Sequence, residues 1–236
     1  MHEISNNANK IICISKFTRD QALKRGFNAS KLKVIPIAFK QTQIRNQKSK
    51  NIKDEEKRFL LYPANYWRHK NHEMLLAAIK LATYEMKPNG PKVICTGYAN
   101  ERRAMELKQL IKALGIEYLV TMEGYVSNNK MEELYEECTG IIFPSLYEGF
   151  GMPVAEAMIN GKPVCCSNNT VLAEVANGGA HLFEPRNPID IKMSIINLLK
   201  DGEFQNSLTK KGYIASKKYQ DFGGMINQYN RAIKEL

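Results

Sequence analysis

Two glutamates eight positions apart, Glu148 and Glu156, are the residues whose types and spacing most suggest chemistry. They flank a glycine turn, Glu148-Gly-Phe-Gly-Met-Pro153, which follows an apolar run expected to form a buried strand. A carboxylate accepts hydrogen bonds from vicinal hydroxyl groups, which is the chemistry that a sugar or a ribose requires. We expect Glu148 to enter the turn and Glu156 to lie in the first turn of the following helix, so that both face one crevice.

The same turn suits a phosphate group. Gly149 and Gly151 let the backbone approach a ligand closely, and Pro153 fits the first position of a helix. A helix N-terminus presents unpaired amides and partial positive charge. Taken singly, each carboxylate is better explained without a ligand: Glu156 complements the helix dipole, and Glu148 is a turn residue. The carboxylates and the flanking sequence together favour a binding site.

Strand-like runs rich in β-branched residues alternate with helical stretches along almost the whole chain. This alternation predicts an α/β fold, a Rossmann-like doubly wound parallel sheet with helices on both faces. The expected strands are 10–14, 33–37, 59–62, 92–96, 118–122, 140–143, 163–166 and 180–183. The expected helices include 15–25, 73–86, 101–114, 130–137 and 153–160, with three more near the C-terminus. A polar stretch without periodicity, 40–57, is expected to be a connector.

The predicted sheet selects the loops that form the site. In open sheets of this kind, ligands bind beyond the carboxyl ends of the strands. That rule points to four loops, 63–71, 97–100, 123–129 and 144–152. The last of them contains the carboxylate turn.

Composition restricts the class of protein. With 236 residues, 44% of them hydrophobic and 25% charged, the chain can bury a core and matches ordinary globular domains. No apolar run approaches the ~20 residues that cross a bilayer, and the N-terminus does not resemble a signal peptide, so we expect a cytoplasmic protein. The formal charge of +10 favours anionic partners such as nucleotides, nucleic acid or an acidic membrane face.

Other chemistries have less support. His69 and His72 lie three positions apart, but no further His or Cys joins them at ligand spacing, so we expect no metal. Five cysteines without CxxC spacing argue against a disulfide framework. Aromatic and basic residues at 62–70 would suit base stacking, yet no nucleic-acid motif is present and the carboxylate pair disfavours a polyanion. The lysine-bearing terminal helices could lie on an anionic membrane, although packing against the domain is the simpler interpretation.

The segment 144–164, which reads Pro-Ser-Leu-Tyr-Glu-Gly-Phe-Gly-Met-Pro-Val-Ala-Glu-Ala-Met-Ile-Asn-Gly-Lys-Pro-Val, closely resembles the Glu-x7-Glu signature of family-four, or group 1, glycosyltransferases. The resemblance extends to 12–18, 34–36, 65–72, 124–126 and Glu174, and so covers nearly the whole chain. These enzymes have two Rossmann-like domains in the glycosyltransferase B fold, an N-terminal one for the acceptor and a C-terminal one for the nucleotide sugar. The resemblance implies that residues 58–236 form the donor domain. Residues 1–39 would be the last strand and helix of the acceptor domain, and residues 40–57 would connect the two.

The resemblance also implies roles for individual residues. Glu148 would contact hydroxyls of the transferred hexose, while backbone amides around Phe150 and Gly151 would hold sugar and diphosphate oxygens. Glu156 would bind the ribose hydroxyls. Lys70 matches the basic residue that neutralises the diphosphate, whose negative charge grows as the glycosidic bond breaks.

Two parts of the site depart from the family pattern or leave alternatives open. The family usually has an arginine a few positions before the lysine; Asn65 occupies roughly that place, and Arg68 is the candidate substitute. The loop with Tyr125 and Val126 resembles the segment that borders the nucleobase, and Gly97 lies on the neighbouring strand end. Backbone contacts there do not distinguish uracil from guanine, so UDP-sugars and GDP-sugars both remain candidates.

The resemblance implies a retaining hexosyltransferase that needs no metal and transfers sugar to a carbohydrate or lipid-linked acceptor, in the cytoplasm or at the inner face of the membrane. A second hypothesis is binding alone. Because the acceptor domain is almost absent from these residues, the chain would then hold the donor and need a partner chain for the acceptor. A related epimerase or phosphorylase is disfavoured by the Pro-Ser-x-x-Glu-Gly-Phe-Gly run.

Overall fold

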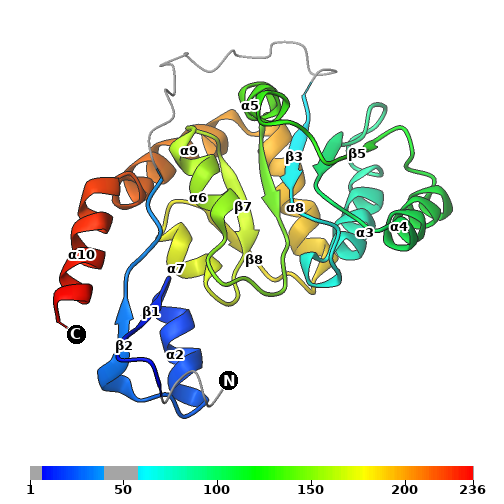
Figure 1. The fold of residues 1–236 in the computed structure, drawn as a ribbon. Coiled ribbons are helices and arrows are strands. Elements are labelled where there is room, and N and C mark those ends of the chain that lie inside the picture. The colour runs from blue at the N-terminus through cyan, green and yellow to red at the C-terminus, as the bar shows by residue number, and fades with distance from the viewer. Residues whose placement is uncertain (1–6, 40–57, 236) are drawn as a thin grey trace.

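A six-stranded parallel sheet forms the centre of the computed structural model, which describes residues 7–39 and 58–235 (Figure 1). The strand order is β5-β4-β3-β6-β7-β8, and all neighbours are parallel. The strands are β3 (Leu60–Pro63), β4 (Val93–Thr96), β5 (Val120–Gly124), β6 (Gly140–Phe143), β7 (Val164–Ser167) and β8 (His181–Phe183). The predicted doubly wound α/β fold is confirmed, and the expected connector lies outside the described residues.

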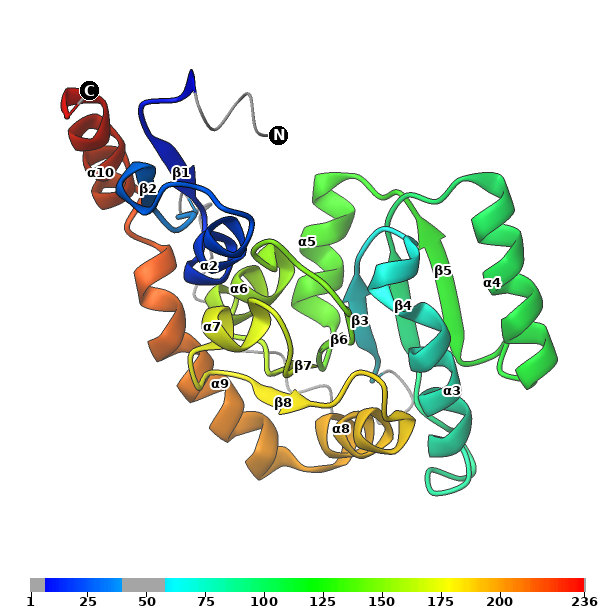
Figure 2. The ribbon, with the colours of Figure 1, turned by 90° about the horizontal axis from the view of Figure 1, so that it is seen from below.

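Helices cover both faces of this sheet (Figure 2). One face carries α3 (His72–Ala82), α4 (Glu101–Leu114) and α8 (Pro188–Lys200). The other carries α5 (Asn128–Glu137), α6 (Met152–Ile159) and the short α7 (Leu172–Ala176). Every residue of β3, β6 and β7 is buried, as expected for parallel strands covered on both sides. Each fully buried Leu or Ile of these strands contributes about 2 kcal/mol through burial.

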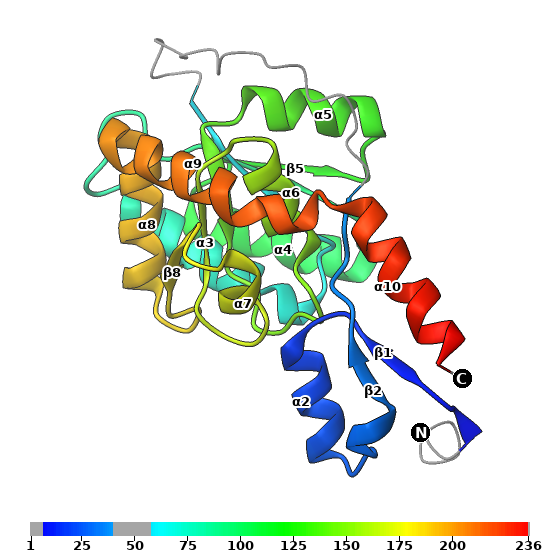
Figure 3. The ribbon, with the colours of Figure 1, turned by 90° about the vertical axis from the view of Figure 1, so that its left-hand side faces the viewer.

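A separate two-stranded parallel sheet is formed by β1 (Ile11–Cys13) and β2 (Leu32–Val34). The connection between them holds α2 (Lys16–Lys24) and a turn of 3-10 helix, η1 (Ala29–Lys31). At the other end of the chain, α9 (Gly202–Ser216), η4 (Lys217–Tyr219) and α10 (Phe222–Lys234) run back from the large sheet to this unit (Figure 3). An ion pair of 3.0 Å between Lys33 and Glu235 and a hydrogen bond from the Phe39 amide to the Tyr219 carbonyl join the two ends.

The helix after the glycine turn differs from the prediction in one respect that matters for the site. Gly151 adopts a left-handed conformation, with φ of 88°, and caps α6, which begins at Met152. Glu156 therefore lies in the second turn of α6, and its expected place in the first turn is wrong. The effect of the helix dipole is confined to the first turn of a helix. Stabilisation of the helix dipole therefore explains a glutamate at position 156 less well than it would if the residue lay in the first turn.

Among the residues that the structure describes, no helix combines the length and the apolar character needed to cross a membrane.

Gly97 shows how closely the loops at the ends of β3 and β4 approach each other. Its φ is 137°, and a Cβ built on it would lie 2.5 Å from the Ala64 carbonyl oxygen. We expect Gly97→Ala to lower the free energy of unfolding, measured in urea, by about 3 kcal/mol, because backbone strain and overpacking add. Gly115→Ala is the matched control, since Gly115 has φ of 63° and open space around its Cβ position, and should lose about 1 kcal/mol. Equal losses in the two variants would contradict a close approach at Gly97.

Candidate active site

The predicted site lies at the carboxyl edge of the large sheet. Because β3, β4, β5 and β6 are parallel, the loops that follow them all emerge at this edge. In the strand order, β3 lies between β6 and β4, so the loop after β3 lies beside the loops after both of these strands, and the loop after β5 lies one strand farther along.

Lys70 and Glu148, predicted to be the catalytic pair, meet in the structure. The ammonium Nζ of Lys70 lies 2.5 Å from Oε1 of Glu148, and the two side chains are only 15% and 11% exposed. The same ammonium lies 5.4 Å from the centroid of the Phe143 ring. A charge that water solvates poorly is stable only beside an opposite charge, so removing either side chain would leave its partner as an uncompensated charge. Each of the two groups is therefore stabilised by the other.

Buried hydrogen bonds hold the backbone that carries Lys70. Lys70 ends a turn of 3-10 helix, η3 (Arg68–Lys70), and its carbonyl accepts a hydrogen bond from the buried Tyr62 hydroxyl. The next residue, Asn71, is left-handed with φ of 63°, and its side-chain amide donates to the carbonyls of Pro144 (3.0 Å) and Pro185 (2.8 Å). Asn71 therefore joins the loop after β3 to the loop after β6.

The loop after β6 makes further bonds to the same segment. The Leu146 amide donates to the His69 carbonyl at 2.7 Å, and the Ser145 hydroxyl donates to the same oxygen at 3.2 Å. From the other side, the Asn169 side-chain amide donates to the Leu146 carbonyl at 2.9 Å. The residues around Lys70 and those leading to Glu148 are thus one bonded unit, although the sequence separates them by more than 70 positions.

The two glycines of the turn have different roles. A Cβ on Gly151 would lie 2.5 Å from Leu172 of α7, so both its conformation and its surroundings require glycine. A Cβ on Gly149 would meet only Ile14, at 3.9 Å. Between them, the Phe150 ring is buried edge-on against Tyr219, with centroids 5.5 Å apart. Within the described parts of the chain, the Phe150 and Gly151 amides donate no hydrogen bond.

Glu156 carries a partly buried carboxylate with few partners. Its closest hydrogen-bond partner is the hydroxyl of Tyr135, a buried residue of α5, at the long distance of 3.5 Å. Burial raises the pKa of Glu156 above its ordinary value, and the bond from Tyr135 opposes this shift. A carboxylate has about four acceptor positions, so this one has capacity for ligand hydroxyls. Tyr135 was not singled out from the sequence, which carries no local signal for its approach to Glu156.

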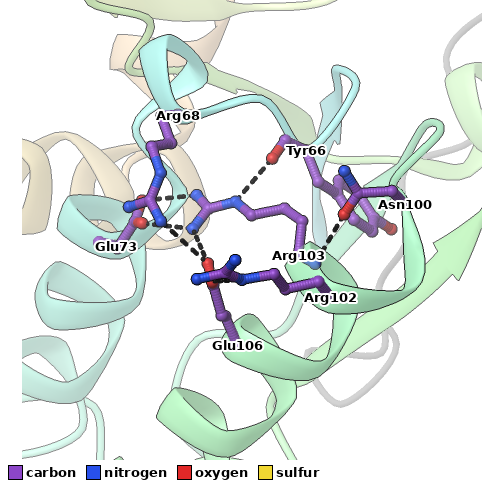
Figure 4. A network of polar contacts seen from close by, with 7 residues as sticks. All are labelled: Tyr66, Arg68, Glu73, Asn100, Arg102, Arg103 and Glu106. Carbon is purple, nitrogen blue, oxygen red and sulfur yellow. Dashed lines mark hydrogen bonds and ion pairs between the residues drawn. The ribbon is translucent and has the colours of Figure 1, made fainter.

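Arg68 lies in a cluster of polar contacts around Arg103 and Glu106 (Figure 4). Its side chain is 75% exposed and pairs at 3.2 Å with Glu106 of α4, which also pairs with Arg102 at 3.2 Å. The cluster borders a hollow of about 440 Å³, lined by Tyr66, Trp67, Arg68, Tyr98, Asn100, Arg102, Arg103 and Glu106. In this arrangement Arg68 does not join Lys70 as a second cation beside Glu148.

Arg103 is the buried centre of this cluster. Its guanidinium makes two bonds to Glu73, of 2.6 and 2.9 Å, and a third from Nε to the Tyr66 carbonyl at 2.8 Å (Figure 4). Paired donors of this kind match a carboxylate in both charge and shape. Arg103 therefore attaches the loop after β3 to α4 and to the start of α3.

Asn65 and Gly97 take part in joining the loops. The Asn65 side-chain oxygen accepts from the Tyr98 amide at 2.8 Å, and the Gly97 amide donates to the Gly124 carbonyl at 2.7 Å. The hydroxyl of Tyr66 links two strand ends, since it donates to the Cys95 carbonyl and accepts from the Gly124 amide. Asn65 is thus hydrogen-bonded to backbone at the place where the resemblance leads us to expect an arginine.

Tyr125 and Val126 follow β5, as the sequence predicts. Tyr125 is 81% exposed, and Val126 is half-buried. Ser127 then caps α5 by accepting a hydrogen bond from the Lys130 amide at 3.3 Å. This segment therefore presents an exposed aromatic side chain just beyond the carboxyl end of β5.

The histidines and cysteines do not assemble into a metal site in the described ranges. No group of three or more His, Cys, Asp or Glu there is placed to hold a metal. His72 is buried between Tyr62 and Tyr66, and burial, with Arg103 nearby, lowers its pKa to about 3, so it is neutral. All five cysteines are buried free thiols.

Comparison with known proteins identifies the family. The family model described as "Glycosyl transferases group 1" matches residues 43–215, and the chain belongs to this family. It is 27% identical over 226 residues to O-antigen chain mannosyltransferase B of Escherichia coli, a match that covers 93% of this chain and 59% of that protein. It is 31% identical over 150 residues to O-antigen chain mannosyltransferase RfbU of Salmonella typhimurium, covering 62% of this chain and 39% of that protein. The chain thus spans less than two thirds of the length of these relatives.

Solved structures share the fold. The crystal structure of Anabaena HepE in complex with UDP and glucose matches with a TM-score of 0.84 at 20% identity, over 100% of this chain and 65% of that one. Sucrose-phosphate synthase from Thermosynechococcus elongatus matches with a TM-score of 0.80 at 20% identity, over 99% of this chain and 59% of that one. Both likenesses support the glycosyltransferase B architecture expected from the sequence.

The joining of the two loops can be tested at Asn71. Asn71→Ala leaves two buried carbonyls without a donor and places alanine in a left-handed conformation, so we expect it to lower the free energy of unfolding by about 3 kcal/mol. Asn177→Ala is the matched control, since Asn177 is also left-handed, with φ of 46°, but is exposed and caps α7 with its backbone alone. It should cost about 1 kcal/mol. Similar losses by urea unfolding would contradict the bridging role of Asn71.

Proposed function

We propose that this chain supplies the donor site of a retaining hexosyltransferase, which moves a sugar from a nucleotide diphosphate sugar to a carbohydrate or lipid-linked acceptor. The observation that carries the proposal is the poorly solvated Lys70–Glu148 ion pair beside the glycine turn of a group 1 chain. Residues 58–236 form the donor domain in this proposal, and the unit at 1–39 belongs to the acceptor domain.

The ion pair explains how a diphosphate and a hexose could be held together. An entering diphosphate offers Lys70 a more strongly charged partner, so the ammonium can exchange Glu148 for phosphate oxygens. The released carboxylate is then free to accept hydrogen bonds from hexose hydroxyls. The unbonded amides of Phe150 and Gly151, at the N-terminus of α6, add donors for the same oxygens.

Glu156 and the outer loops would hold the nucleoside. The partly buried Glu156 carboxylate has room for the two ribose hydroxyls, and the loop with Tyr125 and Val126 would border the base, next to Gly97. Asn65 would support this edge through its bond to the Tyr98 amide. Arg68 would approach the diphosphate only after leaving Glu106, so Lys70 is the main cation of the proposed site.

In the proposed reaction, the bond between the anomeric carbon and the diphosphate breaks while the acceptor oxygen bonds to the same face of that carbon. The leaving phosphate oxygen takes the acceptor proton, so charge and atoms balance without a protein nucleophile. Lys70 stabilises the negative charge that develops on the leaving group. Glu148 orients the hexose and does not attack it, in contrast to the two-carboxylate mechanism of glycosidases. No metal is required in this scheme.

The mannosyltransferase relatives favour mannose as the sugar, while the HepE complex contains UDP and glucose, so both UDP-sugars and GDP-sugars belong in the first screen. A cytoplasmic location, with peripheral contact to the inner face of the membrane through the lysine-bearing terminal helices, is part of the same proposal. The second candidate function is donor binding without transfer. In that case another chain would hold the acceptor, next to β1, α2 and β2 of the described unit at 7–39.

Calorimetric titration with UDP, GDP and ADP, their hexose conjugates and the free nucleosides tests the proposal. We expect Lys70→Ala to weaken nucleotide diphosphate binding by about 10- to 100-fold and nucleoside binding far less, because hydrogen bonds to charged groups contribute about 1.5 to 3 kcal/mol. Glu156→Ala should weaken both. Lys192→Ala is the matched control, since it breaks a different lysine–glutamate pair, with Glu85, away from the site. Unchanged diphosphate affinity in Lys70→Ala would refute the assignment of this loop.

The raised pKa of Glu156 predicts a pH dependence. Ribose hydroxyls bind the ionised carboxylate, which the free protein holds only above this raised pKa. Nucleotide affinity should therefore be full above this raised pKa and fall as the pH is lowered through it, by at most tenfold per pH unit. Glu156→Gln should bind more weakly and lack this part of the pH dependence. Parallel pH profiles for the native chain and Glu156→Gln would exclude contact between Glu156 and the nucleotide.

A further inference from the structure

The glycine turn is bonded to the N-terminal unit as well as to its own domain. The Gly149 carbonyl oxygen lies within hydrogen-bond distance of the hydroxyls of Ser15 (3.2 Å) and Thr18 (3.1 Å), which are also hydrogen-bonded to each other at 2.7 Å. Because each hydroxyl has one proton, one of them donates to the other and the second donates to the carbonyl. Ser15 also caps α2, since its hydroxyl accepts from the Thr18 amide at 3.0 Å. The two hydroxyls at the start of α2 thus hold the peptide group between Gly149 and Phe150.

A second contact fixes α2 in this place. The two oxygens of Glu174, on α7, accept from the backbone amides of Lys16 and Phe17, each at 2.9 Å. The first turn of α2 contains no acidic residue of its own, so Glu174 supplies the negative charge that a helix N-terminus favours. The Phe17 ring also meets Tyr147 edge-on, with centroids 6.0 Å apart. These contacts join α2 to both α7 and the turn (Figures 1 and 3).

Holding the Gly149 carbonyl determines the direction of the next amide. The carbonyl of Gly149 and the N–H of Phe150 belong to one planar, trans peptide group, so they point in opposite directions. With the carbonyl bonded to Ser15 and Thr18, the Phe150 N–H points away from α2 and has no acceptor in the described chain. Rotating this peptide would remove the carbonyl from this pair of hydroxyls and break the hydrogen bond to it, which makes the rotated form roughly tenfold rarer.

We propose that Ser15 and Thr18 are positioning residues, which hold the Phe150 amide ready for the diphosphate or sugar oxygens of the donor, with Glu174 keeping α2 in place. This inference rests on the proposed function, because that function assigns the Phe150 amide to the donor. It adds a role for the N-terminal unit: α2 lies outside the donor domain and sets the geometry of the donor site.

The test removes both hydroxyls with little change elsewhere. In Ser15→Gly/Thr18→Val, glycine remains a tolerated cap of α2, and valine keeps the shape and branching of threonine. We expect calorimetric affinity for UDP or GDP, whichever the native chain binds, and for its hexose conjugate to fall about tenfold, while affinity for uridine or guanosine stays unchanged. Ser15→Gly/Thr18→Ser, which restores one hydroxyl, should recover most of the loss. Asp201→Ala, which removes the side-chain cap of α9, should lower stability without changing these affinities.

The outcomes separate this proposal from the proposed function. If the native chain binds the nucleotide diphosphate and the double variant binds it equally well, the positioning role is overturned and the donor site stands. An equal loss for nucleoside and nucleotide diphosphate would mark a general structural effect and would also overturn the positioning role. If the native chain binds none of the nucleotides or conjugates, both proposals fail together.

Discussion

The ion pair between Lys70 and Glu148 is the interaction on which the rest of the site depends. Two poorly solvated charges are stable only when each has its partner, so the backbone on both sides must hold them within hydrogen-bond distance. The Asn71 side chain provides this support by donating to the carbonyls of Pro144 and Pro185. The loop after β6 provides more, because its Leu146 amide donates to the His69 carbonyl. The parallel sheet makes these bonds possible, because it brings the two loops to neighbouring positions at one edge.

Much of the fold could be predicted from the sequence, because buried parallel strands are continuous apolar runs and helices between them are long enough to show periodicity. Helix α4 and strand β6 have the predicted bounds. Strand β2 ends at Val34, before the predicted end, because Pro36 has no N–H to donate to a partner strand. Helix α3 ends at Ala82, before the predicted end, and turns occupy the residues up to Lys87-Pro88.

The site was predictable only in part. The turn with its two glutamates is a local pattern, and its resemblance to a known family connected it to Lys70. The approach of Tyr135 to Glu156, the contact of Ser15 with Gly149 and the pairing of Arg68 with Glu106 each join residues far apart in the chain, and local sequence holds no signal for them. These long-range contacts determine the partners of the predicted groups, and for Arg68 the partner is Glu106 rather than a group next to Lys70.

The role of the ion pair can be tested with a crystal structure of the chain bound to a nucleotide diphosphate hexose, chosen as the conjugate with the highest affinity. We expect Lys70 Nζ to have moved from Glu148 to a diphosphate oxygen, Glu148 to accept from hexose hydroxyls, and Glu156 to accept from the ribose. A nucleotide bound elsewhere, or a diphosphate beside an unbroken Lys70–Glu148 pair, would contradict it.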